Sequence, residues 1–256
     1  MIDTHCHLDF QAFEQDRAAV IERCKLNGVT QIVVPAVSAA TFKQTIKVCQ
    51  QYSELELALG LHPIFINEHQ PQDLNELDDL ITQHKPIAVG EIGLDFFQTD
   101  LSGDELKEKQ TVFFTKQLII AKQHKLPLII HNRKAHDQCI DLLKQVGSHG
   151  GIIHAFNGSI QQAHKYIELG FVLGFGGMLT FERSSKLRNL AKQIPLESIV
   201  LETDAPDMTV AQHKGERNSP EYLPFIQQAL AVTKQLDPEA IARVTSENAK
   251  RVLHIW

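Results

Sequence analysis

IAVGEIGLD, residues 87–95, is an apolar run that is interrupted by Glu91 and closed by Asp95. Seven other short apolar runs occur along the chain, most of them separated by longer amphipathic stretches. Short strands that alternate with helices are typical of βαβ units and of a parallel sheet. The eight predicted strands span Met1–Thr4, Gln31–Pro35, Glu56–Gly60, Ile87–Glu91, Leu126–His131, Gly151–His154, Phe171–Gly174 and Ser198–Asp204.

Helical patterns lie between these runs, for example at Asp16–Leu26, Thr41–Gln51 and Leu106–Lys122. Eight βα units can close into a TIM, or (β/α)₈, barrel, and 256 residues is the usual size of that fold. A doubly wound open sheet is the alternative, but no phosphate-binding glycine motif follows the first predicted strand. We therefore predict an α/β protein with a single TIM-barrel domain over residues 1–256.

The charge of the chain argues against a broad basic surface for nucleic acid. Its formal net charge is −6 and its sequence pI is about 6.1. A protein that binds nucleic acid through such a surface would be basic. Any attraction for phosphate groups must therefore come from a local source, such as bound cations.

Cysteine usage and the start of the chain favour a cytoplasmic protein. The four cysteines are scattered and form no CxxC pair, which suits a reducing compartment. The first residues lack the basic and apolar regions of a signal peptide. The most apolar stretch, Leu169–Phe181, is too short to span a bilayer. We expect no membrane association, and no obligate protein partner is evident.

Polar side chains that can bind metal follow one apolar run after another. In a TIM barrel, catalytic residues come from the carboxyl ends of several strands, which all lie at one mouth of the barrel. We therefore expect these side chains to converge. They are His5, His7, His62, Glu91, Asp95, His131, His154, Glu202 and Asp204.

Two of these groups carry the metal prediction. His5 and His7 are two residues apart, so strand alternation would turn both imidazoles toward the barrel axis. Glu91 follows a wholly apolar segment, where a carboxylate is costly to bury unless it is paired or binds a cation. A salt bridge to an arginine is the alternative for Glu91. Buried histidines that merely form hydrogen bonds are the alternative for His5 and His7.

The other expected ligands are His131, His154 and Asp204. Imidazole suits zinc and carboxylate suits magnesium or manganese, so the mixed set does not fix which divalent metal binds. We read Asp204 as a ligand or general base and Glu202 as a support for a histidine. Two divalent ions carry four positive charges, of which Glu91 and Asp204 neutralise two, so the centre should attract an anion such as a phosphodiester.

Six short motifs together resemble the TatD family of metal-dependent deoxyribonucleases, and most closely its YjjV-like branch. This family belongs to the amidohydrolase-like barrels. The resemblance extends from Ile2 to about Asn248, and it depends on the order and spacing of the motifs rather than on any one of them. The motifs are His5-x-His7-x-Asp9, Gly60–Pro63, Gly90–Asp95, His131 with Arg133, His154-x-Phe156 and Glu202–Pro206.

The resemblance implies a TIM barrel that cleaves DNA phosphodiester bonds with a metal-activated water. It places the metal ligands at His5, His7, Glu91, His131, His154 and Asp204, with Glu91 between two ions. It places His62 near the substrate phosphate. The family's Arg-Asn-x-Pro segment appears here as Arg217–Pro220, and Ser219 stands where the family often has a glutamate. No role is carried over from that glutamate.

Several further residues are expected to have supporting or packing roles, or to contact phosphate. Arg133 and Arg217 are candidate phosphate contacts, with a surface salt bridge as the alternative for Arg133. Asp9 and Asp95 are expected to orient ligands or cap loops. Three histidines away from the strand ends, His136, His164 and His213, are expected to be solvated, and Phe10 and Trp256 to pack.

Two other functions remain compatible with this sequence. An amidohydrolase-like barrel could use the same metals to hydrolyse a carboxylic ester, such as an aminoacyl-tRNA linkage. A barrel that binds metal but has lost its chemistry is the second alternative. The complete set of predicted ligands, with Asp204 and Glu91 as the catalytic carboxylates, favours the nuclease.

Overall fold

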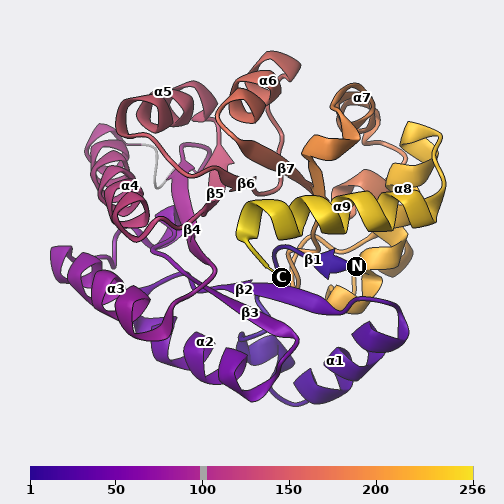
Figure 1. Ribbon diagram of the computed structural model, residues 1–256, viewed down its shortest axis with the longest axis horizontal. Helices are drawn as coiled ribbons and strands as arrows, with labels where there is room; N and C mark the ends of the chain where they lie inside the picture. Colours follow the sequence, from indigo (N-terminus) through magenta and orange to yellow (C-terminus); the bar gives the residue numbers. More distant parts are fainter. Residues whose placement is uncertain (99–102, 256) are drawn as a thin grey trace.

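The computed structural model describes residues 1–98 and 103–255, and it contains one eight-stranded parallel sheet in which spatial order follows chain order (Figure 1). Thr4 N–H donates a hydrogen bond to the Leu201 carbonyl at 3.1 Å, which joins the first strand to the last. The TIM-barrel prediction is confirmed, and an open doubly wound sheet is excluded. The strands are β1 (Ile2–Asp3), β2 (Gln31–Pro35), β3 (Leu55–Leu59), β4 (Ala88–Asp95), β5 (Leu128–Arg133), β6 (Gly151–Ile153), β7 (Phe171–Phe175) and β8 (Ile199–Leu201).

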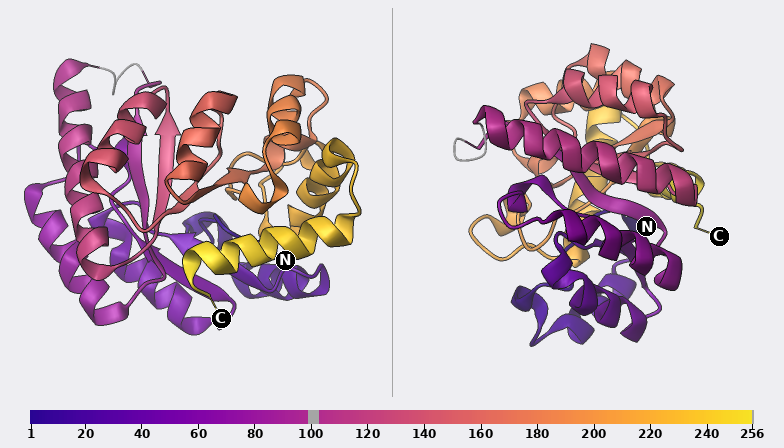
Figure 2. Two further views of the ribbon diagram at one scale, coloured as in Figure 1. Left: turned by 45° about the horizontal axis from the view of Figure 1, so that its top comes forward. Right: turned by 90° about the vertical axis from the view of Figure 1, so that its left-hand side faces the viewer.

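Helices surround the sheet on its outer side (Figures 1 and 2). The three helices predicted in the sequence are confirmed, with each boundary within two residues. Local signals explain where others begin; at α6, for example, the Ser159 side chain accepts a hydrogen bond from the backbone of Gln162. The helices are α1 (Arg17–Leu26), α2 (Ala39–Gln51), α3 (Pro71–His84), α4 (Asp104–His124), α5 (His136–Val146), α6 (Ile160–Glu168), α7 (Ser185–Gln193), α8 (Leu223–Lys234) and α9 (Pro238–Leu253).

Helix α9 crosses one mouth of the barrel (Figures 1 and 2). Its Ala249, Val252 and Leu253 pack on apolar side chains from the amino-terminal parts of the strands, including Ile2 and Val33. Because this mouth is filled by apolar packing, the polar side chains at the opposite ends of the strands are left to form a site.

Strand β4 differs most from its predicted range, because it continues past Glu91 to Asp95. Its pairing with β5 shifts register between Val89 and Ile92. An extra residue in one strand changes which side chains face the interior, and such irregularities are common beside active sites. The shift lets the strand turn Glu91 into the barrel mouth.

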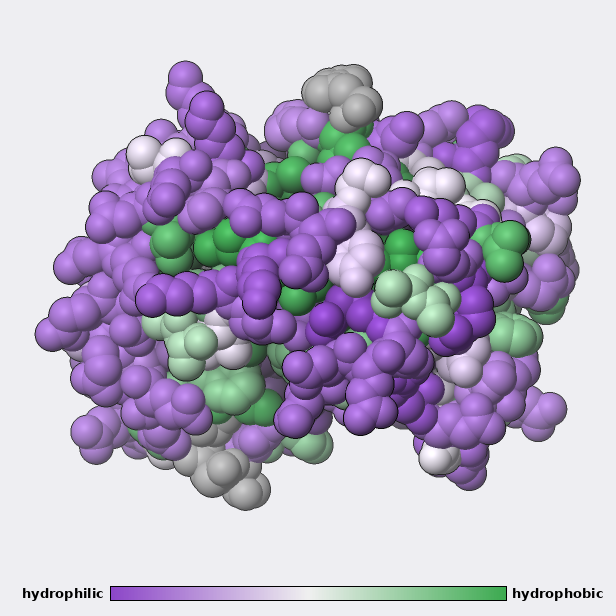
Figure 3. Space-filling view, turned by 90° about the horizontal axis from the view of Figure 1, so that it is seen from below, coloured by the Kyte–Doolittle hydropathy of each residue, from purple (hydrophilic) through white to green (hydrophobic). Residues whose placement is uncertain are grey.

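The outer surface is mainly hydrophilic on the face shown in Figure 3, where apolar side chains show only in patches between polar ones. Among the described residues, no helix has both the length and the apolar character needed to cross a membrane. The four cysteines are free thiols, as their scattered positions in the sequence predict.

Candidate metal centre

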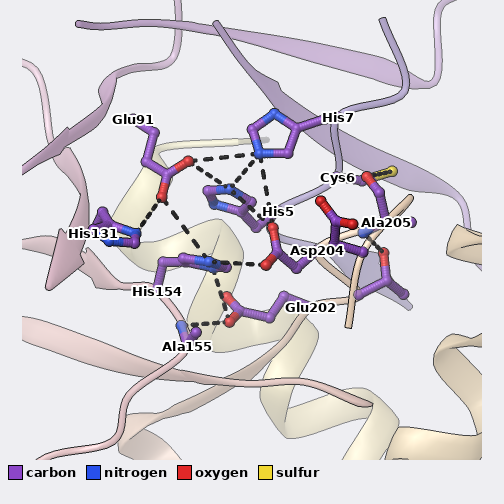
Figure 4. Close-up of polar contacts among 12 residues, drawn as sticks. His5, Cys6, His7, Glu91, His131, His154, Ala155, Glu202, Asp204 and Ala205 are labelled. Carbon is purple, nitrogen blue, oxygen red and sulfur yellow. Dashed lines mark hydrogen bonds and ion pairs between the residues drawn. The ribbon is translucent and has the colours of Figure 1, made fainter. Parts of the chain in front are cut away.

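The six predicted metal ligands meet at the carboxyl-terminal mouth of the barrel (Figure 4). Nitrogen and oxygen atoms of these six residues and of His62 form overlapping groups in which all members lie within 4.8 Å of one another. These groups are His5 with Glu91 and His154; His5 with His7 and Asp204; and His62 with Glu91 and His131. All of these side chains are buried or nearly so.

One half of the centre is built by His5 and His7. Their Nε2 atoms lie 3.3 Å apart and face each other. Glu91 Oε2 is 3.0 Å from Nε2 of His5 and 3.6 Å from Nε2 of His7. Asp204 Oδ1 is 3.7 Å from both nitrogens. Two imidazole nitrogens and two carboxylate oxygens therefore converge on one point, a donor set suited to a divalent cation.

The other half is built around the second oxygen of Glu91. Glu91 Oε1 lies 3.1 Å from Nδ1 of His131 and 4.0 Å from Nε2 of His154. The latter nitrogen is also 3.5 Å from Asp204 Oδ2. Glu91 thus presents one oxygen to His5 and His7 and the other to His131 and His154. This division would allow one carboxylate to bridge two cations.

Close backbone packing gives Glu91 its position. A Cβ atom on Gly60 of the neighbouring strand segment would lie 2.7 Å from the carbonyl carbon of Gly90, so only glycine fits there. The backbone N–H of Glu91 donates to the Ala36 carbonyl at 3.1 Å. The motif glycines around Glu91 therefore serve backbone approach rather than chemistry.

Two histidines of the centre are held from behind by carboxylates. Asp95 Oδ2 lies 3.0 Å from Nε2 of His131, which turns Nδ1 of that ring toward Glu91. Glu202 Oε1 lies 3.0 Å from Nδ1 of His154, which turns Nε2 toward Asp204. Such outer partners fix the ring orientation and the tautomer of a metal-binding histidine. The structure therefore places Asp95 and Glu202 where the sequence-based roles require them.

His62 has a different role from the other histidines of the centre, because a backbone N–H group fixes its tautomer. Its Nδ1 accepts a hydrogen bond from the Ile64 backbone N–H at 3.0 Å. In a neutral ring the proton is then on Nε2, which lies 3.1 Å from Glu91 Oε1 and donates to it. Burial lowers the pKa of His62 to about 4, so the ring is neutral near pH 7. His62 is thus a hydrogen-bond donor rather than a ready metal ligand.

The charges of the centre fit a bound cation. Burial alone would raise the pKa of Glu91, but the surrounding histidines hold that pKa well below its usual range. Asp204 behaves in the same way beside His154, with a pKa of about 2. Burial lowers the pKa of His5. Burial alone would lower the pKa of His131 and of His154, but the neighbouring carboxylates raise both. A cation bound to these two rings would therefore have to displace a proton from each of them.

Asp3 is a buried residue that the sequence analysis did not single out. Its Oδ1 accepts hydrogen bonds from the backbone N–H groups of Thr203 at 2.9 Å and His5 at 3.2 Å. It thereby ties the segment after β1, which carries two ligands, to the segment after β8, which carries Asp204. The signal in the sequence was an acidic residue inside the first apolar run.

The two predicted arginines differ in their positions. Arg133 lies at the rim of the centre, with Nη1 3.7 Å from Asp95 Oδ2. Arg217 is not brought to the centre, because its guanidinium forms two hydrogen bonds with Asp16 at 2.8 and 2.7 Å. It also lies over the Phe13 ring. Both partners precede α1, and the sequence around Arg217 does not predict contacts with them.

Some of the simpler assignments were wrong. His136 is buried, with Nδ1 3.2 Å from the Tyr166 hydroxyl. His213 stacks on the ring of Tyr222 at 3.9 Å rather than being fully solvated. His164 is exposed, as predicted.

The remaining assignments concern packing and support. Phe10 stacks on His7, with ring centroids 4.6 Å apart. Asp9 Oδ2 accepts a hydrogen bond from the Thr45 hydroxyl and so anchors its loop to α2. Trp256 lies outside the described residues.

The centre opens into a cavity of about 550 Å³. Its floor carries the candidate ligands, and its walls are largely apolar. Among the described residues, Arg133 is the one lysine or arginine that lines it. Apolar wall residues include Phe10, Ile64, Phe65, Phe175, Met178 and Met208.

Comparison with known proteins identifies relatives along the whole chain. The family model described as TatD related DNase matches residues 2–254. The metal-dependent hydrolase YjjV of Escherichia coli K12 is 37% identical over 99% of this chain and 98% of its own length. The metal-dependent hydrolase YabD of Bacillus subtilis is 35% identical over 100% of this chain and 99% of its own length.

Solved structures show the same relationship. The crystal structure of the Escherichia coli TatD homologue YjjV superposes with a TM-score of 0.94 at 36% identity, covering 100% of this chain and 98% of that one. A TatD family hydrolase of Entamoeba histolytica shares the fold, with a TM-score of 0.86 at 24% identity over 98% of this chain and 97% of its own. This chain therefore belongs to the TatD family and is a metal-dependent hydrolase.

Proposed function

We propose that this protein is a deoxyribonuclease that hydrolyses DNA phosphodiester bonds with two divalent cations. The observation that carries the proposal is the position of Glu91, whose two carboxylate oxygens face two different pairs of histidines. Two cations on this donor set would leave a net positive charge, since Glu91 and Asp204 neutralise only part of it. Such a centre would attract a phosphodiester to a protein that is acidic overall.

The distances between the donor atoms assign the proposed ligands to two cations. His5 and His7 would hold one cation and His131 and His154 the other, with Glu91 between them and Asp204 reaching both halves. When bound, the cations would supply the Lewis acidity that activates water and stabilises negative charge on phosphate. Magnesium, manganese and zinc all suit part of this donor set.

Asp204 is the proposed proton acceptor. Its side chain is 18% exposed, more than those of His5, Glu91 and His154, so it is the ligand carboxylate that best reaches the cavity. Its low pKa keeps it ionised. As the water oxygen bonds to phosphorus and one ester P–O bond breaks, Asp204 would take the proton from the water. The leaving alcohol oxygen then gains a proton.

His62 is the proposed donor to the phosphate. It lines the same cavity, and its tautomer places its one ring proton on Nε2. That proton points at Glu91 Oε1 and would be free for a phosphate oxygen when this carboxylate oxygen holds a cation. A neutral donor fixed before the reaction can stabilise charge that develops on a phosphate oxygen. The backbone N–H of Ile64 performs this preorganisation without any other side chain.

Hydrolysis assays with defined metals test the proposal. Metal-free protein would be supplied in turn with magnesium, manganese or zinc and given an oligodeoxynucleotide, bis(p-nitrophenyl) phosphate and an aminoacyl-tRNA. We expect hydrolysis of the two phosphodiesters, and we expect Glu91→Gln to abolish it. Deacylation of the tRNA without cleavage of either phosphodiester would favour a carboxylic-ester hydrolase. Bound metal without any hydrolysis would favour a binding protein.

A further inference from the structure

Two cationic side chains share one exposed aromatic ring beside the metal centre. The guanidinium carbon of Arg133 lies 4.1 Å from the centroid of the Phe97 ring, and Nζ of Lys134 lies 4.8 Å from the same centroid. Phe97 is 49% exposed, so its ring holds the two cations at the surface, where a ligand can reach them. The two cations lie two and three residues after His131 in the chain.

The two positive charges have little local compensation. The nearest described carboxylate to Arg133 is Asp95 at 3.7 Å, and that group already contacts His131. Lys134 forms no ion pair with any carboxylate in residues 1–98 and 103–255. Two like charges held on one ring repel each other, and an anion placed between or beside them would remove that repulsion.

A groove of about 520 Å³ continues from the metal centre past these cations. Asn157 lines both the groove and the cavity of the metal centre, so the two spaces adjoin. Arg133 lines the cavity, and Lys134 lines the groove. The remaining lining groups of the groove include Phe96, Ser159 and Gln162.

The other ionisable groups of the groove leave it positive. His136 is neutral, because burial lowers its pKa and its two ring nitrogens contact Tyr166 and Asn157. Asp137 Oδ1 lies 3.8 Å from Nζ of Lys165, which offsets its charge. The described charges around the groove therefore favour an anionic ligand.

We propose that this groove binds the phosphodiester adjacent to the one that is cleaved, with Arg133 and Lys134 as its contacts and Phe97 as their support. This inference rests on the proposed deoxyribonuclease function. The groove adjoins the cavity in which the scissile bond would lie, so a strand that leaves the cavity past Asn157 would bring its next phosphate to Lys134. Phosphate contacts of this kind position a strand without reading its sequence.

Binding measurements test this inference separately from catalysis. A fluorescein-labelled phosphorothioate oligo(dT) of eight nucleotides, chosen because it resists hydrolysis, would be titrated with the metal-loaded protein and followed by anisotropy. We expect Lys134→Gln to weaken binding about fivefold, since one phosphate contact is lost, and to reduce the slope of log K against log salt by about 0.7. Phe97→Ala should weaken binding too, because both cations lose their support.

The matched control is Lys144→Gln, which removes the same charge from the far end of α5, where the lysine is exposed and does not line the groove. We expect it to bind the oligonucleotide within twofold of wild type. Hydrolysis of bis(p-nitrophenyl) phosphate, which is too short to reach the groove, should be the same for wild type, Lys134→Gln and Lys144→Gln.

The outcomes separate the two proposals. If wild type hydrolyses phosphodiesters but Lys134→Gln and Lys144→Gln bind the oligonucleotide equally, the groove assignment is overturned and the nuclease proposal stands. If wild type neither binds the oligonucleotide nor hydrolyses a phosphodiester, both are overturned. If Lys134→Gln lost as much bis(p-nitrophenyl) phosphate hydrolysis as oligonucleotide binding, Lys134 would act on the metal centre itself, contrary to the inference.

Discussion

Glu202 lies behind His154: its Oε1 is 3.0 Å from Nδ1 of that ring, while Nε2 on the opposite side faces Asp204. The same oxygen accepts a hydrogen bond from the Ala155 backbone N–H at 2.6 Å. Glu202 is fully buried. It therefore fixes the direction in which His154 points its other ring nitrogen, Nε2.

The first prediction concerns this support. Glu202→Ala should weaken metal binding by about 10- to 100-fold, because His154 loses the carboxylate that orients it. Glu202→Gln keeps an oxygen for Ala155 and the ring but removes the charge, so its loss should be smaller. Competition for zinc with a chromophoric chelator measures both. Wild-type affinity in Glu202→Ala would show that His154 is oriented by other contacts.

The second prediction uses a glycine to move the same carboxylate. A Cβ atom at Gly174 would lie 2.2 Å from Glu202 Oε2 and 2.6 Å from its carboxyl carbon, so Gly174→Ala must displace Glu202. We expect metal affinity to fall about as far as in Glu202→Ala. Gly176→Ala is the matched control, because its Cβ would come only within 3.3 Å of the Glu202 carbonyl oxygen. Equal metal affinity in the two variants would contradict this account.

Much of the centre could be predicted from the sequence, because parallel strands end at one mouth of a barrel. His131 lies in the second half of β5 and His154 directly follows β6, each after an apolar run that contains β-branched residues. His5 and His7 face each other for a different reason from the predicted one. Strand β1 ends at Asp3, and the two histidines are held beyond it by backbone hydrogen bonds to the segment 204–205, so strand alternation does not apply.

Other features depended on contacts between residues far apart in the chain. Nothing around Arg217 indicates that Asp16 would bind its guanidinium. Similarly, the burial of His136 depends on Tyr166 of α6 and Asn157 of the preceding loop, which no local pattern connects to it. Local sequence thus predicts what ends a strand, but it does not predict which side chains of neighbouring helices will meet.

The third prediction tests whether His62 is a hydrogen-bond donor or a metal ligand. Because Ile64 N–H occupies Nδ1, the Nε2 proton of His62 should serve as a donor while the metal is held by other residues. His62→Asn, which is too short to present a donor at that position, should leave metal stoichiometry unchanged and lower kcat about 100-fold. His62→Gln places an amide N–H near the original Nε2 and should recover part of the rate.

Metal analysis of the purified His62 variants decides this point independently of activity. If His62→Asn bound one equivalent fewer than wild type, His62 would be a ligand together with Glu91 and His131, and the tautomer argument would fail. If both variants bound the wild-type amount and kept the wild-type kcat, His62 would be a structural residue of its turn.

The last prediction concerns pH and His136, which is buried between Tyr166 and Asn157. Burial lowers its pKa from the usual 6.5, so the folded state keeps it neutral where the unfolded chain takes up a proton. The stability it contributes is therefore complete above about pH 6.5 and is lost as pH falls below that value, by at most about 1.4 kcal/mol per pH unit. His136→Gln should remove this dependence.

Urea unfolding of the metal-free protein at pH 7.5, 6.5 and 5.5 measures the effect. The difference in the free energy of unfolding between wild type and His136→Gln should become smaller as the pH falls. His164→Gln, which replaces an exposed histidine, should keep the wild-type slope; parallel slopes for wild type and His136→Gln would show that His136 is protonated equally in the folded and unfolded chains.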